Sequence, residues 1–562
     1  MDAIKVKDVS FTYQDMYSNA LSKMNLEVNE GELVVLMGKS RAGKSTLCRV
    51  LNALIPTFYN GIFYGTVEIL NELTFGKKVF EVAKDVGMVF QDFESQLFST
   101  NVELECAFGP ENFCISRDEI INRMKESLLK VGLIGFEKRN PTTLSGGEKQ
   151  RLAIASILTM KPKILLMDEP TTDLDPLGKS EIFAVCELLK EDGVTLLLVE
   201  HEIELAYYAD KIILMDQGEM VLEGAPDEVL RKVRLMERCG IRPPQIPRLF
   251  QELKYKKKLP LTPQEAYQIF KQQNWQIPEG RYNVLKWRDG KRMEKYQDPV
   301  IEIANLEFNY PDGKKVLEEI DLTIRQGEFV AILGQNGSGK TTLVKHFNGL
   351  LKPTKGNVLV SGINTRRRKV SDMAKEVGFI FQNPDCQIFE HTIFDEVAFG
   401  PRNLGISEKE VSRRVYDALT AVQLEAYEKD DPFALTKGEK QKLAVASILA
   451  CTPKILILDE PTTGLDYHEI ISIMNLLAEL NERGHTIIII THSMWVAVEY
   501  AHRIIVLSEG KIILDDTPRM VFKEEEILKQ FHLLVPEIVS LSNMLGNMTL
   551  LSVDEFKFCL LD

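Results

Sequence analysis

Short, uninterrupted apolar runs alternate along this chain with longer amphipathic stretches. Runs of four or five aliphatic side chains without a polar position are typical of strands that are buried on both faces of a sheet. The clearest runs are residues 33–37, 164–167, 196–199, 329–333, 455–458 and 487–490. Stretches with helical spacing fill the intervals, so the pattern predicts an α/β fold with parallel strands.

The pattern occurs twice. A separation of 291 residues joins Gln91 to Gln382, and the same separation joins His201 to His492. The likeness extends past the apolar strands, since CGIRPPQIPRL in the first half resembles FHLLVPEIVSL in the second. We therefore expect a first domain over residues 1–272 with a C-terminal appendage, a linker over 273–298, and a second such domain over 299–562.

Composition narrows the class of protein. The 562 residues are 44% hydrophobic and 27% charged, as in a soluble globular protein. The longest apolar runs are far shorter than a membrane span, and the first residues lack a signal-peptide core, so we expect a cytoplasmic protein. Eight cysteines without a C-x-x-C pair argue against zinc or iron–sulfur clusters, and a net charge of −14 argues against a nucleic-acid-binding surface.

Two phosphate-binding loops follow the first strand of each predicted parallel sheet. The segments GKSRAGKS and GQNGSGKT both fit the pattern G-x-x-x-x-G-K-[ST], whose backbone N–H groups close round phosphates while its lysine neutralises their charge. A helix should begin directly after each loop, with its positive end toward the anion. The predicted nucleotide-binding residues here are Gly38, Gly43, Lys44, Ser45, Thr46, Gly334, Asn336, Gly337, Ser338, Gly339, Lys340, Thr341 and Thr342.

Two strands end in a pair of carboxylates, Asp168-Glu169 and Asp459-Glu460. The carboxyl end of a parallel strand is where α/β sheets present ligand groups. The aspartate of each pair suits a Mg²⁺ partner, and the glutamate can polarise a water for attack on a phosphate. The alternative, a strand followed by an ordinary capping acid, is weakened because Pro-Thr-Thr follows both pairs.

A third pair of motifs opens a predicted helix in each half. Ser145-Gly146-Gly147 and Thr436-Lys437-Gly438 offer N–H donors at a helix N-terminus, which favours an anion. A capping box, in which Ser145 caps the helix and Glu148 bonds back, is the structural alternative. Both interpretations can hold together.

The ordered set of motifs resembles a tandem ABC ATPase over nearly the whole chain: Walker A, Gln loop, LSGGE signature, Walker B, D-loop (174–175 and 465–466) and switch histidine. The resemblance implies two P-loop domains, each with a mixed β-sheet core, a helical signature subdomain and a small C-terminal appendage. It also implies ATP and Mg²⁺ as cofactors. Tyr13 and Tyr310 would stack on adenine, Glu169 and Glu460 would be catalytic bases, and His201 and His492 would contact the γ-phosphate. The implied metal ligands are Ser45, Gln91, Asp168, Thr341, Gln382 and Asp459.

A narrower resemblance follows each Gln loop, where a Q-[LI]-F segment precedes E-x-A-F-G-P. This stretch is similar to the ATPases of energy-coupling-factor (ECF) importers for vitamins, vitamin precursors or metals. It implies a transmembrane scaffold (T) subunit and a small substrate-binding (S) subunit as partners, no nucleic acid, and a peripheral location on the cytoplasmic face of the membrane. The alternatives are a sugar-importer ATPase and a soluble tandem ABC factor acting on ribosomes or DNA.

In ABC ATPases each ATP lies between the Walker A loop of one half and the signature of the other. The site that pairs Lys340 with Ser145 would then keep every expected group. The site that pairs Lys44 with Thr436 has three departures: Arg41 in Walker A, Lys437 in the signature, and Tyr467 after the D-loop. We expect Lys437 to be penalised where glycine would take a positive φ and allow close approach. The hypothesis is one competent site and one degenerate site that mainly holds ATP; the alternative is drift, with both sites turning over.

Overall fold

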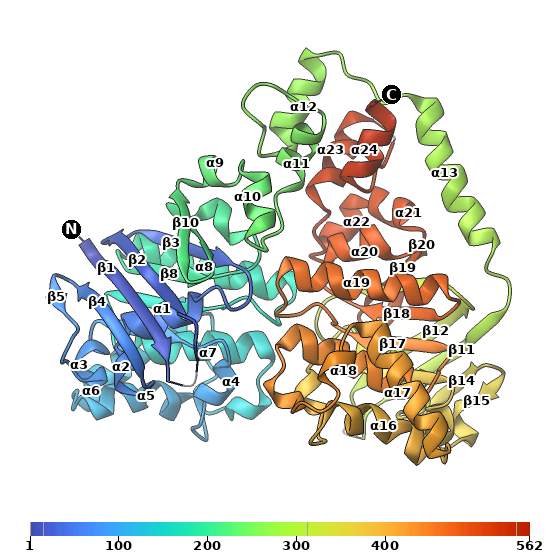
Figure 1. The fold of residues 1–562 in the computed structure, drawn as a ribbon, viewed down its shortest axis with the longest axis horizontal. Helices are drawn as coiled ribbons and strands as arrows, with labels where there is room; N and C mark the ends of the chain where they lie inside the picture. The colour runs from blue at the N-terminus through green and yellow to red at the C-terminus, as the bar shows by residue number, and fades with distance from the viewer. Residues whose placement is uncertain (1, 15, 312, 547, 562) are drawn as a thin grey trace. The chain divides into compact units, whose positions relative to one another are not determined.

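The computed structural model describes residues 2–14, 16–311, 313–546 and 548–561. Packing divides the chain into two compact units, which Figure 1 shows in colours from blue to red along the chain. Unit 1 holds residues 1–247 with 466–468, and unit 2 holds residues 248–465 with 469–562.

Unit 1 contains two sheets. An antiparallel sheet has the order β2-β1-β4-β5, and a six-stranded sheet has the order β10-β9-β3-β8-β7-β6. Strands β3, β6, β7, β8 and β9 of the second sheet are parallel, and β10 pairs antiparallel with β9 at one edge. The strands are β1 (Asp2–Tyr13), β2 (Leu21–Asn29), β3 (Leu33–Gly38), β4 (Gly61–Ile69), β5 (Glu72–Leu73), β6 (Val86–Val89), β7 (Ile164–Asp168), β8 (Thr195–Val199), β9 (Lys211–Asp216) and β10 (Glu219–Gly224).

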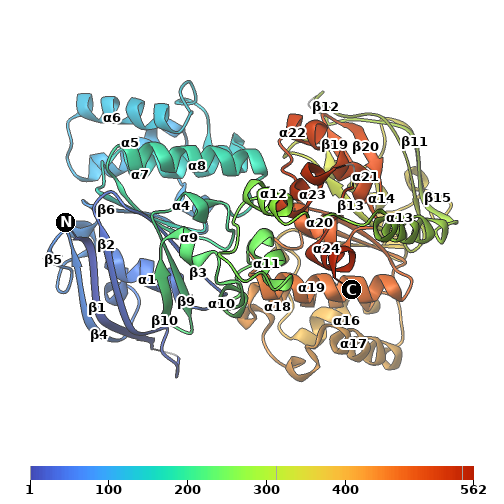
Figure 2. The same cartoon turned by 90° about the horizontal axis from the view of Figure 1, so that it is seen from above.

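The helices of unit 1 follow from the same local patterns. Helix α1 starts directly after the phosphate loop, and α5, α6 and α7 lie side by side as a helical layer (Figure 2). The helices are α1 (Lys44–Leu51), α2 (Leu54–Thr57), α3 (Val79–Val82), α4 (Phe93–Gln96), α5 (Val102–Asn112), α6 (Arg117–Lys130), α7 (Gly146–Leu158), α8 (Pro176–Glu191), α9 (Pro226–Val229) and α10 (Val233–Arg238), with α11 (Gln245–Glu252) crossing into unit 2.

Unit 2 repeats this arrangement, with sheet orders β12-β11-β14-β15 and β16-β17-β18-β13-β19-β20. Its strands are β11 (Pro299–Asn309), β12 (Lys315–Arg325), β13 (Phe329–Leu333), β14 (Lys355–Val360), β15 (Ile363–Asn364), β16 (Val377–Ile380), β17 (Ile455–Asp459), β18 (Thr486–Ile490), β19 (Arg503–Ser508) and β20 (Lys511–Asp516). Its further helices are α12 (Pro263–Gln272), α13 (Glu279–Glu294), α14 (Lys340–Phe347), α15 (Val370–Met373), α16 (Ile393–Asn403), α17 (Glu408–Val422), α18 (Lys437–Leu449), α19 (Tyr467–Glu482), α20 (Met494–Tyr500), α21 (Pro518–Lys523), α22 (Glu525–Gln530), α23 (Glu537–Leu545) and α24 (Val553–Leu560). All six apolar runs lie in buried central strands, so the predicted parallel α/β core is confirmed.

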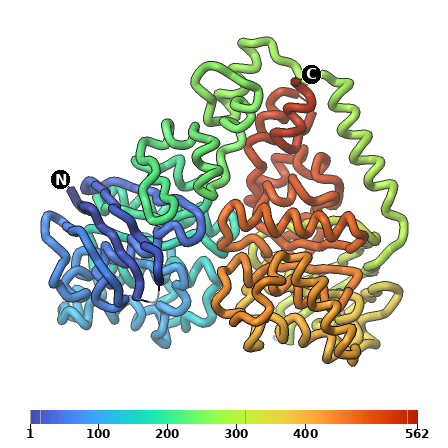
Figure 3. Tube along the Cα trace, in the orientation of Figure 1, coloured from blue at the N-terminus to red at the C-terminus, as the bar shows by residue number. Residues whose placement is uncertain are grey.

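The packing boundary between the units differs from the boundary that the repeat predicts. Residues 248–272 follow the first half in sequence, yet they pack in unit 2. Phe250 and Phe270 lie 6.0 Å apart, and Phe270 lies 6.1 Å from Phe556, measured between ring centroids. Burying these rings together favours one shared cluster. The predicted linker contains α13, and the trace passes from α12 through α13 to β11 (Figure 3).

Candidate functional site

The two phosphate loops have matching geometry. Lys44 Nζ donates to the carbonyls of Gly38 and Lys39 at 2.8 and 2.9 Å, and Lys340 Nζ donates to those of Gly334 and Gln335 at 2.8 Å each. Both loops end in a left-handed glycine at the N-cap of the following helix, Gly43 at φ 97° and Gly339 at φ 104°. The predicted strand–loop–helix units are therefore present in both halves.

Hydroxyl–carboxylate pairs lie beside both loops. Thr341 Oγ1 donates to Asp459 Oδ2 at 2.9 Å, and the Ser45 side chain is hydrogen-bonded to Asp168. Burial raises the pKa of Asp168 and of Asp459 above the usual range, while the hydroxyl bonds lower it. A hydroxyl and a carboxylate at the head of a phosphate loop are oxygen ligands of the type that Mg²⁺ prefers, so these residues fit that ion.

Two predicted residues of the first half, Gln91 and His201, converge on Glu169. Gln91 Nε2 donates to Glu169 Oε2 at 2.7 Å, and His201 Nε2 lies 2.9 Å from Glu169 Oε1. Glu169 is buried and has a φ of 53°, which is uncommon for a residue with a side chain. Strain of this kind tends to collect at functional sites, so the geometry favours a chemical role for this group.

The second half builds the equivalent cluster around Glu460. His492 Nε2 lies 3.0 Å from Glu460 Oε1 and 3.0 Å from Asn336 Oδ1 of the phosphate loop, and Glu460 has a φ of 48°. Gln382 follows β16 just as Gln91 follows β6. Phosphate loop, carboxylate and histidine therefore meet at one end of the parallel strands in each unit.

The two tyrosines lie at the edge of these clusters. The hydroxyl of Tyr13 lies 3.2 Å from Thr46 Oγ1, and that of Tyr310 lies 3.2 Å from Thr342 Oγ1. Each ring also contacts a nearby phenylalanine edge-on, Phe11 for Tyr13 and Phe308 for Tyr310. Both tyrosines thus lie beside the first turn of the helix that follows the adjacent phosphate loop.

Comparisons with known proteins agree with this geometry. The ABC transporter family profile matches residues 21–172 and 317–463. A Caldanaerobacter subterraneus subsp. tengcongensis protein, named as an ABC transporter ATP-binding protein, is 52% identical over 560 residues, which cover 99% of this chain and 98% of the relative.

The chain belongs to the ABC transporter family. It carries two ABC ATPase domains, binds ATP and hydrolyses it. A similarly named Methanosarcina acetivorans protein is 40% identical over 546 residues, covering 95% of this chain and 89% of its own length. Among solved structures, cbiO1 from Clostridium perfringens, described as part of the ABC transporter complex cbiONQ, is 38% identical, with a TM-score of 0.39 over 43% of this chain and 98% of its own.

The signature segments of this ABC ATPase open two capped helices. Ser145 Oγ accepts from the Glu148 N–H at 3.3 Å, and Thr436 Oγ1 accepts from the Glu439 N–H at 3.1 Å, each as part of a capping box. Gly146 is the first residue of α7 and lies outside the left-handed region, as does Lys437 in α18. The expected positive-φ penalty at Lys437 is therefore wrong, because both residues are helical. A difference in side-chain bulk remains.

Walker A carries a real backbone difference between the halves. Gly337 has a φ of 78°, and Arg41, at the same loop position of the first half, has a φ of 62°. The loop requires a left-handed residue here, and a residue with a Cβ pays roughly 1 to 2 kcal/mol for that conformation. The first loop is thus strained at one residue where the second is not.

One buried carboxyl escaped the sequence analysis. Glu200 precedes the switch histidine, is 2% exposed, and accepts from the Thr171 N–H at 3.2 Å and from Thr171 Oγ1 at 2.9 Å. Burial, helped by the charge of Glu202, raises its pKa to about 8. The second half has Thr491 at this position. The sequence does carry a signal for this carboxyl, because a glutamate precedes the switch histidine of the first half and a threonine precedes that of the second.

The segments after the Gln loops share a second unexpected contact. Glu105 is buried and accepts from the N–H groups of Phe98 and Ser99 at 3.1 and 2.8 Å, and Glu396 binds the corresponding turn in the second half. The turn holds Phe98 edge-on to Phe108 at 4.6 Å, with both rings exposed. The glutamate of E-x-A-F-G-P therefore fixes a turn that presents two aromatic rings.

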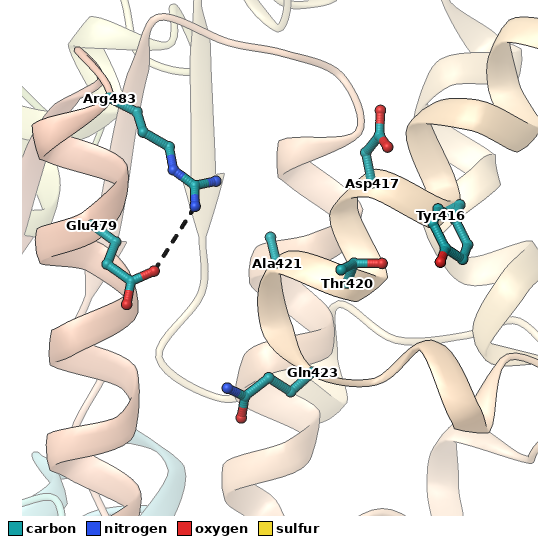
Figure 4. A pocket seen from close by; sticks show the side chains of 7 residues that line it. All are labelled: Tyr416, Asp417, Thr420, Ala421, Gln423, Glu479 and Arg483. Atoms are coloured by element: carbon teal, nitrogen blue, oxygen red, sulfur yellow. Dashed lines mark ion pairs between the residues drawn. The ribbon is translucent and has the colours of Figure 1, made fainter.

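A separate cavity of about 450 Å³ opens between α17 and α19. Figure 4 shows Tyr416, Asp417 and Thr420 on one wall and the ion pair of Glu479 with Arg483 on the other. It contains no motif residue. In the part of the chain that the structure describes, no helix is both long and apolar enough to cross a bilayer.

Proposed function

We propose that this chain is the energising ATPase of an ECF-type importer and couples hydrolysis of Mg-ATP to the uptake of a vitamin, a vitamin precursor or a metal. The observation that carries the proposal is the pair of exposed rings after each Gln loop, held by a buried glutamate at the same place in both halves. Exposed aromatic pairs of this kind are typical of protein contact surfaces. In the ECF family this surface receives helices of the scaffold subunit.

The partners in this proposal are a transmembrane T subunit and a small membrane S subunit. They would hold the chain as a peripheral protein on the cytoplasmic face of the membrane. Closure of the two halves on ATP would move the scaffold, and release of phosphate would reopen them. The cargo would be selected by the S subunit.

Within each half, the residues already described have assigned roles in this proposal. Mg²⁺, when bound, would neutralise phosphate charge; Ser45 and Asp168 would hold it in the first half, and Thr341 and Asp459 in the second. Glu460 would accept the proton of the attacking water, and His492 would orient the γ-phosphate. Glu169 and His201 have the same assignments in the first half.

We further propose that the composite sites differ in rate. The site that combines Lys340 and Glu460 with Ser145 would be competent, and the site that combines Lys44 and Glu169 with Thr436 would be degenerate and hold ATP. The strained φ of Arg41 and the bulk of Lys437 support this division. The positive charges of Arg41 and Lys437 would favour binding of ATP in the degenerate site without stabilising the transition state for its hydrolysis.

Two glutamine variants test the division of rate. Glu460→Gln should lower ATP turnover by about 10² or more. Glu169→Gln should lower it by no more than about threefold. Equal losses in the two variants would remove the asymmetry.

Affinity purification from detergent-solubilised membranes tests the partners. The chain should bring down small polytopic membrane proteins, and a variant with Phe98→Ser and Phe389→Ser should lose them while its ATPase rate stays within twofold. Exposed Phe58→Ser is the matched control. Co-sedimentation with ribosomes instead of membrane proteins would refute the importer assignment. Co-purification of sugar-transport permeases would refute the ECF assignment in favour of a sugar importer.

A further inference from the structure

We propose that the appendage helix of each half, α10 or α22, positions the Walker A loop through the second residue of that loop. This residue is Lys39 in the first half and Gln335 in the second. Both are positioning residues, because each acts on the Walker A lysine and not on the nucleotide itself. The inference requires only ATP binding by the two loops, so it stands apart from the choice of transport partner.

The contact in the second half is a direct hydrogen bond. Helix α22 ends with the His532 N–H donating to the Lys529 carbonyl at 3.0 Å, the Leu533 N–H donating to the Leu528 carbonyl at 3.0 Å, and His532 at a φ of 54°. This helix-ending motif uses two carbonyls of the last turn and leaves that of the C-cap residue, Phe531, for another donor. Gln335 Nε2 donates to the Phe531 carbonyl at 2.9 Å.

The first half ends α10 in the same way. The Gly240 N–H donates to the Glu237 carbonyl at 3.0 Å, the Ile241 N–H donates to the Met236 carbonyl at 2.9 Å, and Gly240 has a φ of 70°. Gly240 lies against the loop so closely that a Cβ added to it would be 2.6 Å from the Cβ of Lys39. The helix end therefore contacts the same loop residue in both halves.

Different side chains fix that residue in the two halves. Lys39 Nζ forms an ion pair of 2.6 Å with Asp216 Oδ1 at the end of β9. Ser508 ends β19, the corresponding strand of the second half, and offers no charge, and there the loop carries a glutamine that bonds to the helix end. The first half thus holds the second residue of the loop with a lysine–aspartate ion pair, and the second half holds it with a hydrogen bond from glutamine to a carbonyl. These are two chemical solutions for fixing the same loop residue.

The anchored residue also holds the Walker A lysine. The carbonyl of Lys39 accepts from Lys44 Nζ at 2.9 Å, and the carbonyl of Gln335 accepts from Lys340 Nζ at 2.8 Å. The side chain of the second loop residue thus binds the end of the appendage helix in the second half, or a neighbouring strand in the first. The backbone carbonyl of the same residue accepts a hydrogen bond from the phosphate-binding lysine. A shift of the appendage helix would move that carbonyl, so the appendage is in a position to tune ATP affinity.

Steady-state ATPase assays of full-length variants test this inference. Gln335→Glu replaces the donor with a second acceptor facing the Phe531 carbonyl. We expect its KM for ATP to rise about fivefold, as for the loss of one hydrogen bond, with kcat within twofold of the parent. Gln335→Lys combined with Ser508→Asp transplants the ion pair of the first half and should return the KM to within twofold. Gln326→Glu, the same change at an exposed turn before β13, should alter neither constant.

Apparent melting temperatures of the same variants separate positioning from a purely structural contact. A lower melting temperature for Gln335→Glu with an unchanged KM would overturn the proposal, because the bond would then serve folding alone. A double variant whose KM stays as high as that of Gln335→Glu would overturn the claim that the two solutions are equivalent. The turnover of the parent protein is the reference in every assay. An inactive parent would therefore refute the ATPase assignment, which is distinct from a failure of the proposed role of the appendage helices.

Discussion

Glu200 gives the most quantitative prediction for this protein, through the variant Glu200→Gln. Its side chain is almost wholly buried beside the switch histidine, and both hydrogen bonds from Thr171 reach one of its oxygens. An amide keeps an oxygen to accept those bonds but carries no ionisable proton. The variant therefore isolates the effect of titration at this position.

The magnitude follows from the raised pKa. The folded pKa is about 8, against a usual value of 4.5. Between these two values the folded chain keeps a proton that the unfolded chain has released, so the free energy of unfolding falls as pH rises. The contribution is fully present below pH 4.5 and is lost as pH rises through 8. Each unit of separation is worth about 1.4 kcal/mol, so the loss across the whole window is about 5 kcal/mol.

The assay is thermal unfolding of the parent and of Glu200→Gln at pH 5.5, 7.0 and 8.5. Between pH 5.5 and 8.5 the parent should lose about 3 kcal/mol that the variant does not lose. For a unit of about 250 residues, the melting temperature of the variant should therefore rise by roughly 6 to 12 °C relative to that of the parent over this pH range. Glu187→Gln, an exposed glutamate on α8, is the control and should show no such trend. A difference between parent and Glu200→Gln that stays constant with pH would refute the reasoning.

Three further variants test features of the two halves. Arg41→Gly should raise the free energy of unfolding by about 0.5 to 1 kcal/mol, because glycine relieves the left-handed strain but gains freedom in the unfolded chain; a lower melting temperature would contradict this. Glu396→Gln should lower the free energy of unfolding by about 1 kcal/mol, because the amide keeps an oxygen acceptor but replaces a charged acceptor with a neutral one; an unchanged urea midpoint would count against it. In a Glu460→Gln background, Lys437→Gly should raise the residual ATP turnover at least tenfold if the degenerate signature limits the other site. A rate equal to that of Glu460→Gln alone would point to a different limit.

Local sequence was sufficient for the elements that build each ATPase half. Continuous aliphatic runs can be satisfied only by strands covered on both faces, and a glycine-rich loop before a lysine has few other conformations. The repeat then placed both copies in the same order. For this reason the parallel strands, the phosphate loops and the capped signature helices could be predicted from residue types and spacing.

Other properties depended on contacts between distant segments. The sequence could not show that residues 248–272 pack in unit 2, because that depends on whether Phe270 meets Phe556. It also misjudged the backbone at Lys437, since a glycine-rich motif is compatible with either a nest or a helix start until its neighbours are placed. The raised pKa of Glu200 and the bond from Gln335 to Phe531 exist only where the folded chain excludes water and brings separate segments together. Sequence thus set the local elements and the chemistry they carry, and tertiary packing set burial, strain and the partners of each group.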